Sequence, residues 1–149
     1  MTHSDAWNEM ADSCYCDYDA PEFFHREIRR ARKLHKCGEC GGEIKPGEQY
    51  EHVRGKWDGD LTTIKTCERC VDIITWTKNN VPCLCYAYGN AIEDCQEAVN
   101  EASARAPEDT AGLRFGLLRR ITVRDRLNAE RRKARENGVS DLQERPAPG

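Results

Sequence analysis

The chain is poor in apolar residues and has no long apolar run. Hydrophobic residues make up 38% and aromatic residues 7% of its 149 residues, against 33% for charged residues. No stretch approaches the roughly 18–20 consecutive apolar residues that a membrane-spanning helix needs, so we expect no membrane partner. The residues after Met1 are polar and acidic rather than apolar, which predicts no secretory signal and a reducing, cytoplasmic setting.

Lysine and arginine are missing from residues 1–22, which carry six acidic side chains. Residues 23–36 reverse this balance, with six basic side chains against Glu27 alone. The formal net charge of the whole chain is −3, so the protein is not globally basic. The pattern predicts a flexible acidic N-terminus at residues 1–13 and, separately, a basic segment.

Two matched cysteine pairs are the strongest motif in the chain. Cys37-x-x-Cys40 and Cys67-x-x-Cys70 are separated by twenty-six residues. Each pair presents two thiolates from one tight turn, and Zn²⁺ accepts four such sulfurs at roughly 2.3 Å in a tetrahedral site. The spacing therefore predicts a structural zinc site with these four residues as ligands. In a chain with so little apolar sequence, the metal would organise folding.

A second set of cysteines lies outside this motif, as Cys14-x-Cys16 and Cys83-x-Cys85. A bent backbone, favoured beside Cys83 by Pro82, lets both thiolates of such a pair reach one metal. The two pairs predict either a second four-thiolate zinc site or reduced thiols packed in the core, and disulfides are not expected in a reducing compartment. Residues that are alternatives for one of these ligands are Cys95, Asp17 and His25.

The segments around the first motif read as strands and helices. Residues 49–54 and 61–66 are rich in β-branched and aromatic residues, and Asp58-Gly59 between them is a hairpin signal. Residues 68–78 read as a helix. Residues 23–34 are expected to form an extended segment leading to Cys37, although Phe24, Ile28 and Ala31 fit one face of a helix equally well. Asn90 is expected to cap a helix that follows it, with Glu93 in a variant of the capping box. A last helix is expected to reach Glu136.

These elements predict an α+β protein built on a small treble-clef zinc domain, which consists of a zinc knuckle, a β-hairpin and a helix, followed by two α-helices. The predicted parts are a flexible acidic N-terminus at residues 1–13, the treble-clef domain at 14–90, a helical extension at 91–136 and a disordered tail at 137–149.

The cysteine framework resembles small treble-clef proteins encoded by tailed bacteriophages and prophages. The similarity spans residues 14–120, and its elements include the run from Cys37 to Tyr50, Trp57-Asp-Gly59 and Lys65-Thr-Cys-Glu-Arg-Cys70. Further matching segments are Cys16-Asp-Tyr-Asp19, Arg32-Lys-Leu-His-Lys-Cys37 and Pro82-Cys-Leu-Cys-Tyr-Ala-Tyr-Gly-Asn90. The resemblance implies a setting, the cytoplasm of an infected bacterial host, more than an activity.

Histidine is absent after His52, which argues against an enzyme. A treble clef of the HNH nuclease type needs a histidine in the hairpin and a further Asn or His on the helix to hold a catalytic metal. His52 supplies the first, but Asn79 and Asn80 lie at the helix end, a poor place for the second. Four cysteines also close the coordination shell that a hydrolytic zinc needs open. We therefore predict a non-catalytic protein.

Two kinds of partner remain. A host or phage protein is the first expectation, because a rigid hairpin with a tryptophan at its tip offers the residue types that dominate interfaces. Such binding would serve counter-defence or host takeover. The alternative is DNA or RNA, bound by the basic segments 26–36 and 119–135. The residues expected to contact a protein are Trp57, Tyr50, Arg54 and Lys56, and those expected to contact nucleic acid are Arg29, Arg30, Arg32, Lys33, Arg119 and Arg120.

Overall fold

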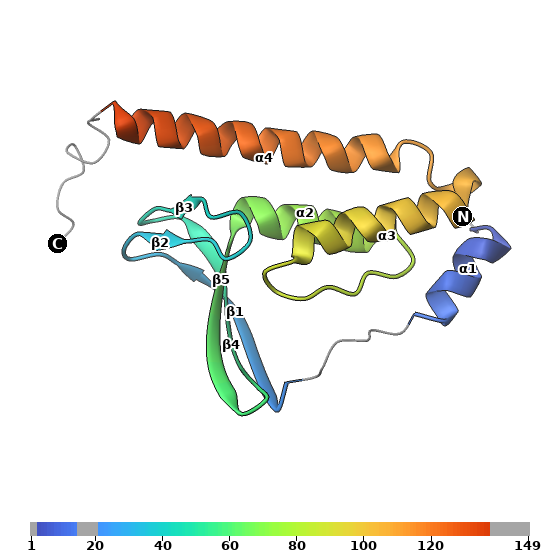
Figure 1. The fold of residues 1–149 in the computed structure, drawn as a ribbon, viewed down its shortest axis with the longest axis horizontal. Coiled ribbons are helices and arrows are strands. Elements are labelled where there is room, and N and C mark those ends of the chain that lie inside the picture. Colours follow the sequence, from blue (N-terminus) through green and yellow to red (C-terminus); the bar gives the residue numbers. More distant parts are fainter. Residues whose placement is uncertain (1–2, 15–20, 138–149) are drawn as a thin grey trace.

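The computed structural model describes residues 3–14 and 21–137 of the chain. This part is an α+β structure, as predicted, with four α-helices, one 3-10 helix and two small antiparallel sheets (Figure 1). In chain order the elements are α1 (Asp5–Asp12), β1 (Phe23–Arg30), β2 (His35–Lys36), β3 (Glu43–Ile44), β4 (Gln49–Trp57), β5 (Asp60–Cys67), α2 (Glu68–Asn80), α3 (Ala91–Arg105), η1 (Pro107–Asp109) and α4 (Leu113–Glu136).

The larger sheet is formed by β1, β4 and β5, with β4 in the centre and both pairings antiparallel. The hairpin predicted around Asp58-Gly59 is confirmed, and both turn residues have positive φ angles, of 51° and 84°. Such angles define the tight turn that suits the twist of two paired strands, which is why Asp-Gly is favoured there. The extended segment predicted before Cys37 forms β1.

Alternation along β4 gives this sheet two different faces. Val53 is fully buried on one face, which we call the covered face, and on the same face Phe24 of β1 stacks on Tyr88 at 6.4 Å. The other face, called the open face, carries Tyr50, His52, Arg54 and Lys56 of β4. Their neighbours in register on the same face are Phe23, His25, Glu27 and Arg29 of β1 and Leu61, Thr63, Lys65 and Cys67 of β5.

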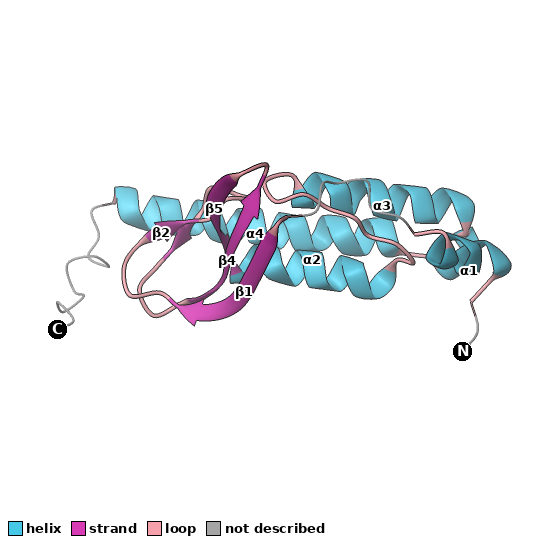
Figure 2. Ribbon diagram, turned by 90° about the horizontal axis from the view of Figure 1, so that it is seen from below, coloured by secondary structure: helices cyan, strands magenta, loops and turns pink. Residues whose placement is uncertain are grey.

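The main apolar core lies among the helices. Ile73 of α2, Val99 of α3 and Leu117 of α4 are each 3% exposed or less and belong to one cluster. Figure 2 shows α2, α3 and α4 side by side, with the sheets at one end of this layer. The helices after the hairpin are therefore packed on the helix that follows the second cysteine pair.

The first residues differ from the flexible N-terminus that the sequence predicted. Asp5–Asp12 form α1, where the Ser4 hydroxyl accepts a hydrogen bond from the Trp7 N–H at 3.2 Å and caps the helix. Met10 is 4% exposed and joins the helical core. Two apolar side chains three residues apart, Trp7 and Met10, thus share one helix face in an otherwise polar stretch.

Helix α3 begins after Asn90 as predicted, but the predicted capping box does not form. The Asn90 side chain donates to Asp94 at 3.1 Å instead of capping the helix. The free N–H groups at this helix start are satisfied from elsewhere, because the Glu39 carboxylate accepts from Gly89 and Ala91 at 2.6 and 3.0 Å. The turn that carries the first cysteine pair is therefore tied to the start of α3.

Helix α4 is a single helix of 24 residues, close to the bounds that the sequence predicted. Its first half lies against α2 and α3, and its second half continues past them over the small β2–β3 sheet (Figure 1). None of the helices in residues 3–14 and 21–137 combines the length and the apolar character needed to cross a membrane.

Candidate metal centre

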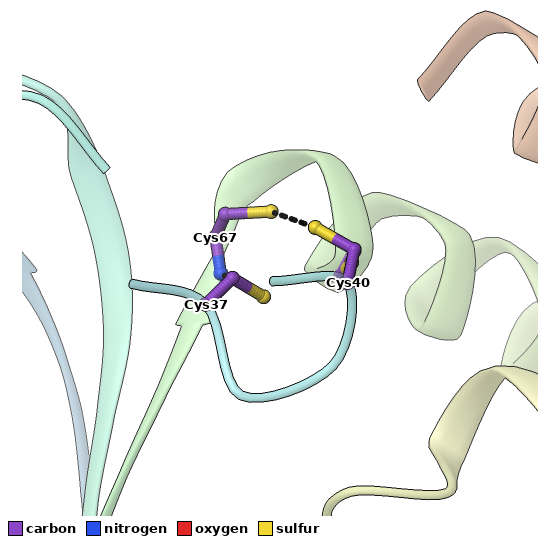
Figure 3. A group of neighbouring side chains, drawn as sticks. Cys37, Cys40 and Cys67 are labelled. Atoms are coloured by element: carbon purple, nitrogen blue, oxygen red, sulfur yellow. Dashed lines mark hydrogen bonds between the residues drawn. The ribbon is translucent and has the colours of Figure 1, made fainter. Parts of the chain in front are cut away.

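The four cysteines of the two Cys-x-x-Cys pairs come together as predicted. Cys37 and Cys40 lie in the turn after β2, Cys67 ends β5 as the N-cap of α2, and Cys70 lies in the first turn of α2. Their Sγ atoms all lie within 4.8 Å of one another, and those of Cys40 and Cys67 are 3.8 Å apart (Figure 3). This cluster can hold a metal ion.

Backbone amides point at these sulfurs. The N–H groups of Glu39 and Cys67 donate to Cys37 Sγ at 3.3 Å each, and the N–H of Gly42 donates to Cys40 Sγ at 3.3 Å. Gly41, directly after the second cysteine, has a φ of 73°, which a glycine adopts without strain and which lets the turn fold back. Such N–H donors stabilise negative charge on sulfur, as a thiolate ligand requires.

The pKa values of the four thiols are shifted in opposite directions. Cys40 raises the pKa of Cys37, but hydrogen bonds from Cys67 and Cys70 lower it to about 6. Hydrogen bonds from Cys37, then Cys67 and Cys70, hold the pKa of Cys40 far below its usual range. Hydrogen bonds with Cys37 and Cys40, together with burial, in turn raise the pKa values of Cys67 and Cys70. A bound cation removes this conflict, because it stabilises all four thiolates at once.

Two side chains of α4 complete the surroundings of the sulfurs. Asn128 Nδ2 donates to Cys40 Sγ at 3.3 Å, and Arg124 Nη1 lies 3.6 Å from Cys70 Sγ. The Asn128 carbonyl is held by Arg69 Nε at 3.0 Å. This role for α4 was not predicted from the sequence. The one signal for it in the sequence is a set of four polar residues at helical spacing on one face, namely Arg124, Asn128, Arg131 and Arg135.

The remaining members of this row fasten α4 to the small sheet. Arg131 makes a two-pronged ion pair with Glu48 at 2.6 and 2.8 Å, and Arg135 pairs with Glu43. Burial raises the pKa of Glu48, but hydrogen bonds from Arg131 and from the Lys45 N–H lower it by more. The pKa of Glu48 therefore lies below its usual range. Glu48 is therefore a carboxylate at neutral pH, and α4 is held over the cluster by charge as well as by hydrogen bonds.

The second set of cysteines also comes together, but in a different chemical state. Cys14 and Cys83 form a disulfide, so the expectation that the chain contains no disulfide is wrong. The Sγ atoms of Cys83 and Cys85 are 4.0 Å apart, and those of all three residues lie within 4.8 Å. Cys16 and Asp17 lie outside the described residues. Cys-x-Cys pairs that meet can bind a metal as thiolates or be oxidised to disulfides, and the sequence alone does not show which occurs.

The other residues considered for that site lie elsewhere. Cys95 is a fully buried free thiol in the helical core, where desolvation raises its pKa. His25 is exposed on the open face and pairs with Glu27 at 3.1 Å. Neither belongs to the cluster of Cys14, Cys83 and Cys85.

The residues expected to bind a protein are separated along β4. Trp57 pairs with Asp60 directly beside the hairpin turn, and its ring packs edge-on against Phe24 at 6.3 Å and covers Gly55. Tyr50 is 5% exposed, lies at the opposite end of the strand and contacts His35 at 5.2 Å, so its expected exposure is wrong. Arg54 is exposed. Lys56 lies 3.8 Å from the Glu22 carboxylate.

The residues expected to bind nucleic acid fall into two places. Four of them line one basin of about 980 Å³, together with residues that the sequence analysis did not connect with them; its lining is Arg29, Arg30, Ala31, Arg32, Lys33, His35, Tyr50, His52 and Lys65. Arg119 and Arg120 instead line a pocket of about 490 Å³ between α2 and α4. Arg120 also lies over the Trp76 ring at 4.5 Å.

His52, the only histidine of the expected hairpin, is 8% exposed and lines the basin. Desolvation lowers its pKa, and the positive charge of Arg29 lowers it further. Its Nδ1 atom is buried without a hydrogen-bond partner among the described residues. His52 is therefore a neutral imidazole at neutral pH.

Comparison with known proteins adds no relative. No family model matches the chain, and no similar curated protein or solved structure is found.

Proposed function

We propose that this chain is a non-catalytic recognition protein whose fold is held by one Zn²⁺ on Cys37, Cys40, Cys67 and Cys70. Four thiolates are the donor set that zinc takes in closed structural sites. The order of cysteine turn, β-hairpin and helix supports a treble-clef zinc domain within the α+β fold. Four cysteines fill the tetrahedral shell, so the metal has a structural role and no position for a hydrolytic water.

The partner is a host or phage protein, and the observation that carries this is an exposed apolar group at one end of the sheet. Phe23, Phe24 and Leu61 are 44%, 46% and 53% exposed. Phe23 and Leu61 flank Lys56 in register on the open face. We call these three residues the apolar end. Exposed aromatic and aliphatic side chains beside a cationic one are what interface hot spots use.

The setting is the cytoplasm of a phage-infected bacterium, which rests on the resemblance of the cysteine framework to phage and prophage proteins. Counter-defence or host takeover needs only a rigid surface that binds a protein, and the zinc-held sheet supplies one. No reaction chemistry is required of the chain.

The test replaces Leu61 with the photo-reactive residue p-benzoylphenylalanine and irradiates the protein in bacterial lysate. The control places the same residue at Glu101, which is exposed on α3, remote from the sheet. We expect a discrete protein adduct from position 61 that is absent from position 101 and is lost when Phe23→Ser, the neighbour of position 61 on the open face, is added. Equal adducts from both positions, or an adduct that the Phe23→Ser change leaves intact, would contradict the proposal.

A second candidate function is nucleic-acid binding, and one observation favours it. Arg29, Arg30, Arg32 and Lys33 lie around the same basin rather than being scattered over the surface. Clustered cations of this kind neutralise phosphates. The basin lies near the cysteine end of the sheet and the apolar end at the other, so the cations of the second candidate lie at the opposite end of the sheet from the apolar residues of the first.

A further inference from the structure

Five cationic side chains from three segments surround the basin. Arg29 and Arg30 come from the end of β1, Arg32 and Lys33 from the turn that follows, and Lys65 from β5. His35, Tyr50 and His52 line the rest, and no carboxylate is among the lining residues. We call this set the basic basin. Like charges gathered in a concavity raise the local positive potential and attract anions.

Most of this charge is not neutralised within the described parts of the chain. Arg29 pairs with Glu27, and Arg30 donates to the Gly47 carbonyl at 2.6 Å. The side chains of Arg32, Lys33 and Lys65 make no hydrogen bond or ion pair with residues 3–14 or 21–137. Three unpaired cations around one concavity repel one another, so an anion between them lowers the electrostatic energy.

The basic basin does not serve to offset the charge of the metal cluster. A cationic side chain already contacts a cluster sulfur, namely Arg124, which approaches from α4. Asn128 and three backbone amides provide the other donors to sulfur. None of these donors belongs to the basin. Its charge is therefore available to an external ligand.

The open face continues the basin in one direction. Arg29 faces Tyr50 in register, and His52 lies between Lys65 of β5 and Glu27 of β1, the carboxylate that pairs with Arg29. His25, Arg54 and Phe23 follow on the same face toward the apolar end. At about 3.3 Å per strand residue, the six steps from Arg29 to Phe23 span about 20 Å. Glu27 on this face is paired with Arg29, and Arg54 adds a cation beyond the five of the basin. A basic basin that continues along the strands over this length fits a linear polyanion better than a single phosphate.

We infer that the basic basin binds the phosphate backbone of single-stranded nucleic acid, which then runs along the open face. This inference rests on the second candidate function above and names its site and ligand. Proteins that bind single strands combine a cationic groove with exposed rings on which bases stack. On this face the exposed rings are His25 and Phe23.

The test measures anisotropy of a fluorescein-labelled oligothymidylate of about 20 nucleotides, long enough to cover this length of the open face. The variant is Arg32→Gln/Lys33→Gln/Lys65→Gln. The matched control, Arg105→Gln/Arg126→Gln/Lys133→Gln, removes the same charge from exposed positions on α3 and α4 that form no ion pair within the described residues. Thermal unfolding and zinc content check that both variants are folded, and a duplex, pyrophosphate and a phosphoserine peptide serve as competitors.

Five phosphate contacts predict a slope of about −3.5 for the logarithm of affinity against the logarithm of salt, hence a loss of about 130-fold between about 50 and 200 mM. With three cations removed, the expected slope is about −1.4 and the loss about 7-fold. The control is expected to keep the wild-type slope, and the duplex to compete less well than an unlabelled single strand.

Several results would overturn the inference. These are the absence of strand binding at low salt, an unchanged slope in the basin variant, and an equal loss in the control. Displacement by pyrophosphate, duplex or phosphoserine peptide as effectively as by single strand would assign the basin to another ligand. The basin variant keeps Phe23, Phe24 and Leu61, so a failure here is distinguishable from a failure of the photo-crosslinking test.

Discussion

Replacing Asn128 with alanine is expected to weaken zinc binding although Asn128 is not a ligand. Its amide donates to Cys40 Sγ at 3.3 Å, and its carbonyl accepts from Arg69 Nε at 3.0 Å. Alanine removes both bonds. Arg69 keeps its second contact, at 3.0 Å to the Glu43 carbonyl, so the main loss falls on the sulfur.

The size of the effect follows from the charge on that sulfur. A hydrogen bond to an ionised group contributes about 1.5–3 kcal/mol. Loss of a partner of a metal ligand typically costs about 10–100-fold in metal affinity, which corresponds to about 1.4–2.8 kcal/mol. The two ranges agree, so we expect Asn128→Ala to raise the zinc dissociation constant by about 10–100-fold.

Competition with a chromophoric zinc chelator measures this constant, and circular dichroism reports whether α4 stays helical. Asn100→Ala is the matched control, because Asn100 also accepts from an arginine, Arg114 Nε at 3.0 Å, but on α3 away from the sulfurs. Asn128→Asp keeps the acceptor for Arg69 and places a negative charge beside Cys40, so it should weaken zinc binding more than alanine does. A folded Asn128→Ala protein with the zinc affinity of Asn100→Ala would refute the reasoning.

Three further predictions concern the cysteines and one buried carboxylate. Cys67→Ala is expected to lose the metal and, with it, about 10–16 kcal/mol of binding energy linked to folding. Metal analysis and circular dichroism should therefore show a metal-free protein with an unfolded hairpin. Cooperative unfolding without metal would contradict this. Cys14→Ser opens a disulfide that spans 69 residues, and the loop length sets the loss in the free energy of unfolding by urea at no more than about 4 kcal/mol, because Cys85 is disulfide-bonded as well. Reductant without added zinc should abolish the difference from wild type, and when zinc is then added, reduced wild type should take up a second ion that Cys14→Ser does not. Burial raises the pKa of Glu51 although Arg26 opposes this, so its carboxylate form destabilises the fold at pH 7. Glu51→Gln should therefore be more stable than wild type at pH 7, by a margin that shrinks as the pH falls and Glu51 is protonated; a margin that grows on acidification would show the sign to be wrong.

Local signals were enough to predict the cysteine cluster and the strands around it. The Cys-x-x-Cys spacing forces two thiols into one turn, and Asp58-Gly59 sets the register of β4 and β5. These features depend on residues that are close in sequence, or on one hairpin that brings its ends together. The positions of Cys37, Cys40, Cys67 and Cys70 follow from them.

The parts that could not be predicted depend on long-range contacts. Asn128 reaches Cys40 across 88 residues, and nothing in its own helix distinguishes it from a solvated asparagine. The burial of Tyr50 depends on His35 from another strand, and the N-terminal helix depends on a core built from α2, α3 and α4. The disulfide depends on the oxidation state of two thiols that are 69 residues apart in sequence and meet only when the chain has folded.

The row of polar side chains on α4 also has a consequence for synthesis on the ribosome. Arg124 follows Cys70 by 54 residues, so at about 5–20 residues per second the four sulfurs emerge several seconds before this guanidinium is made. A nascent chain can therefore capture metal loosely and tighten its hold only when the last helix settles. Chains that stall within α4 would release metal readily, which distinguishes unfinished copies from finished ones by chelation alone.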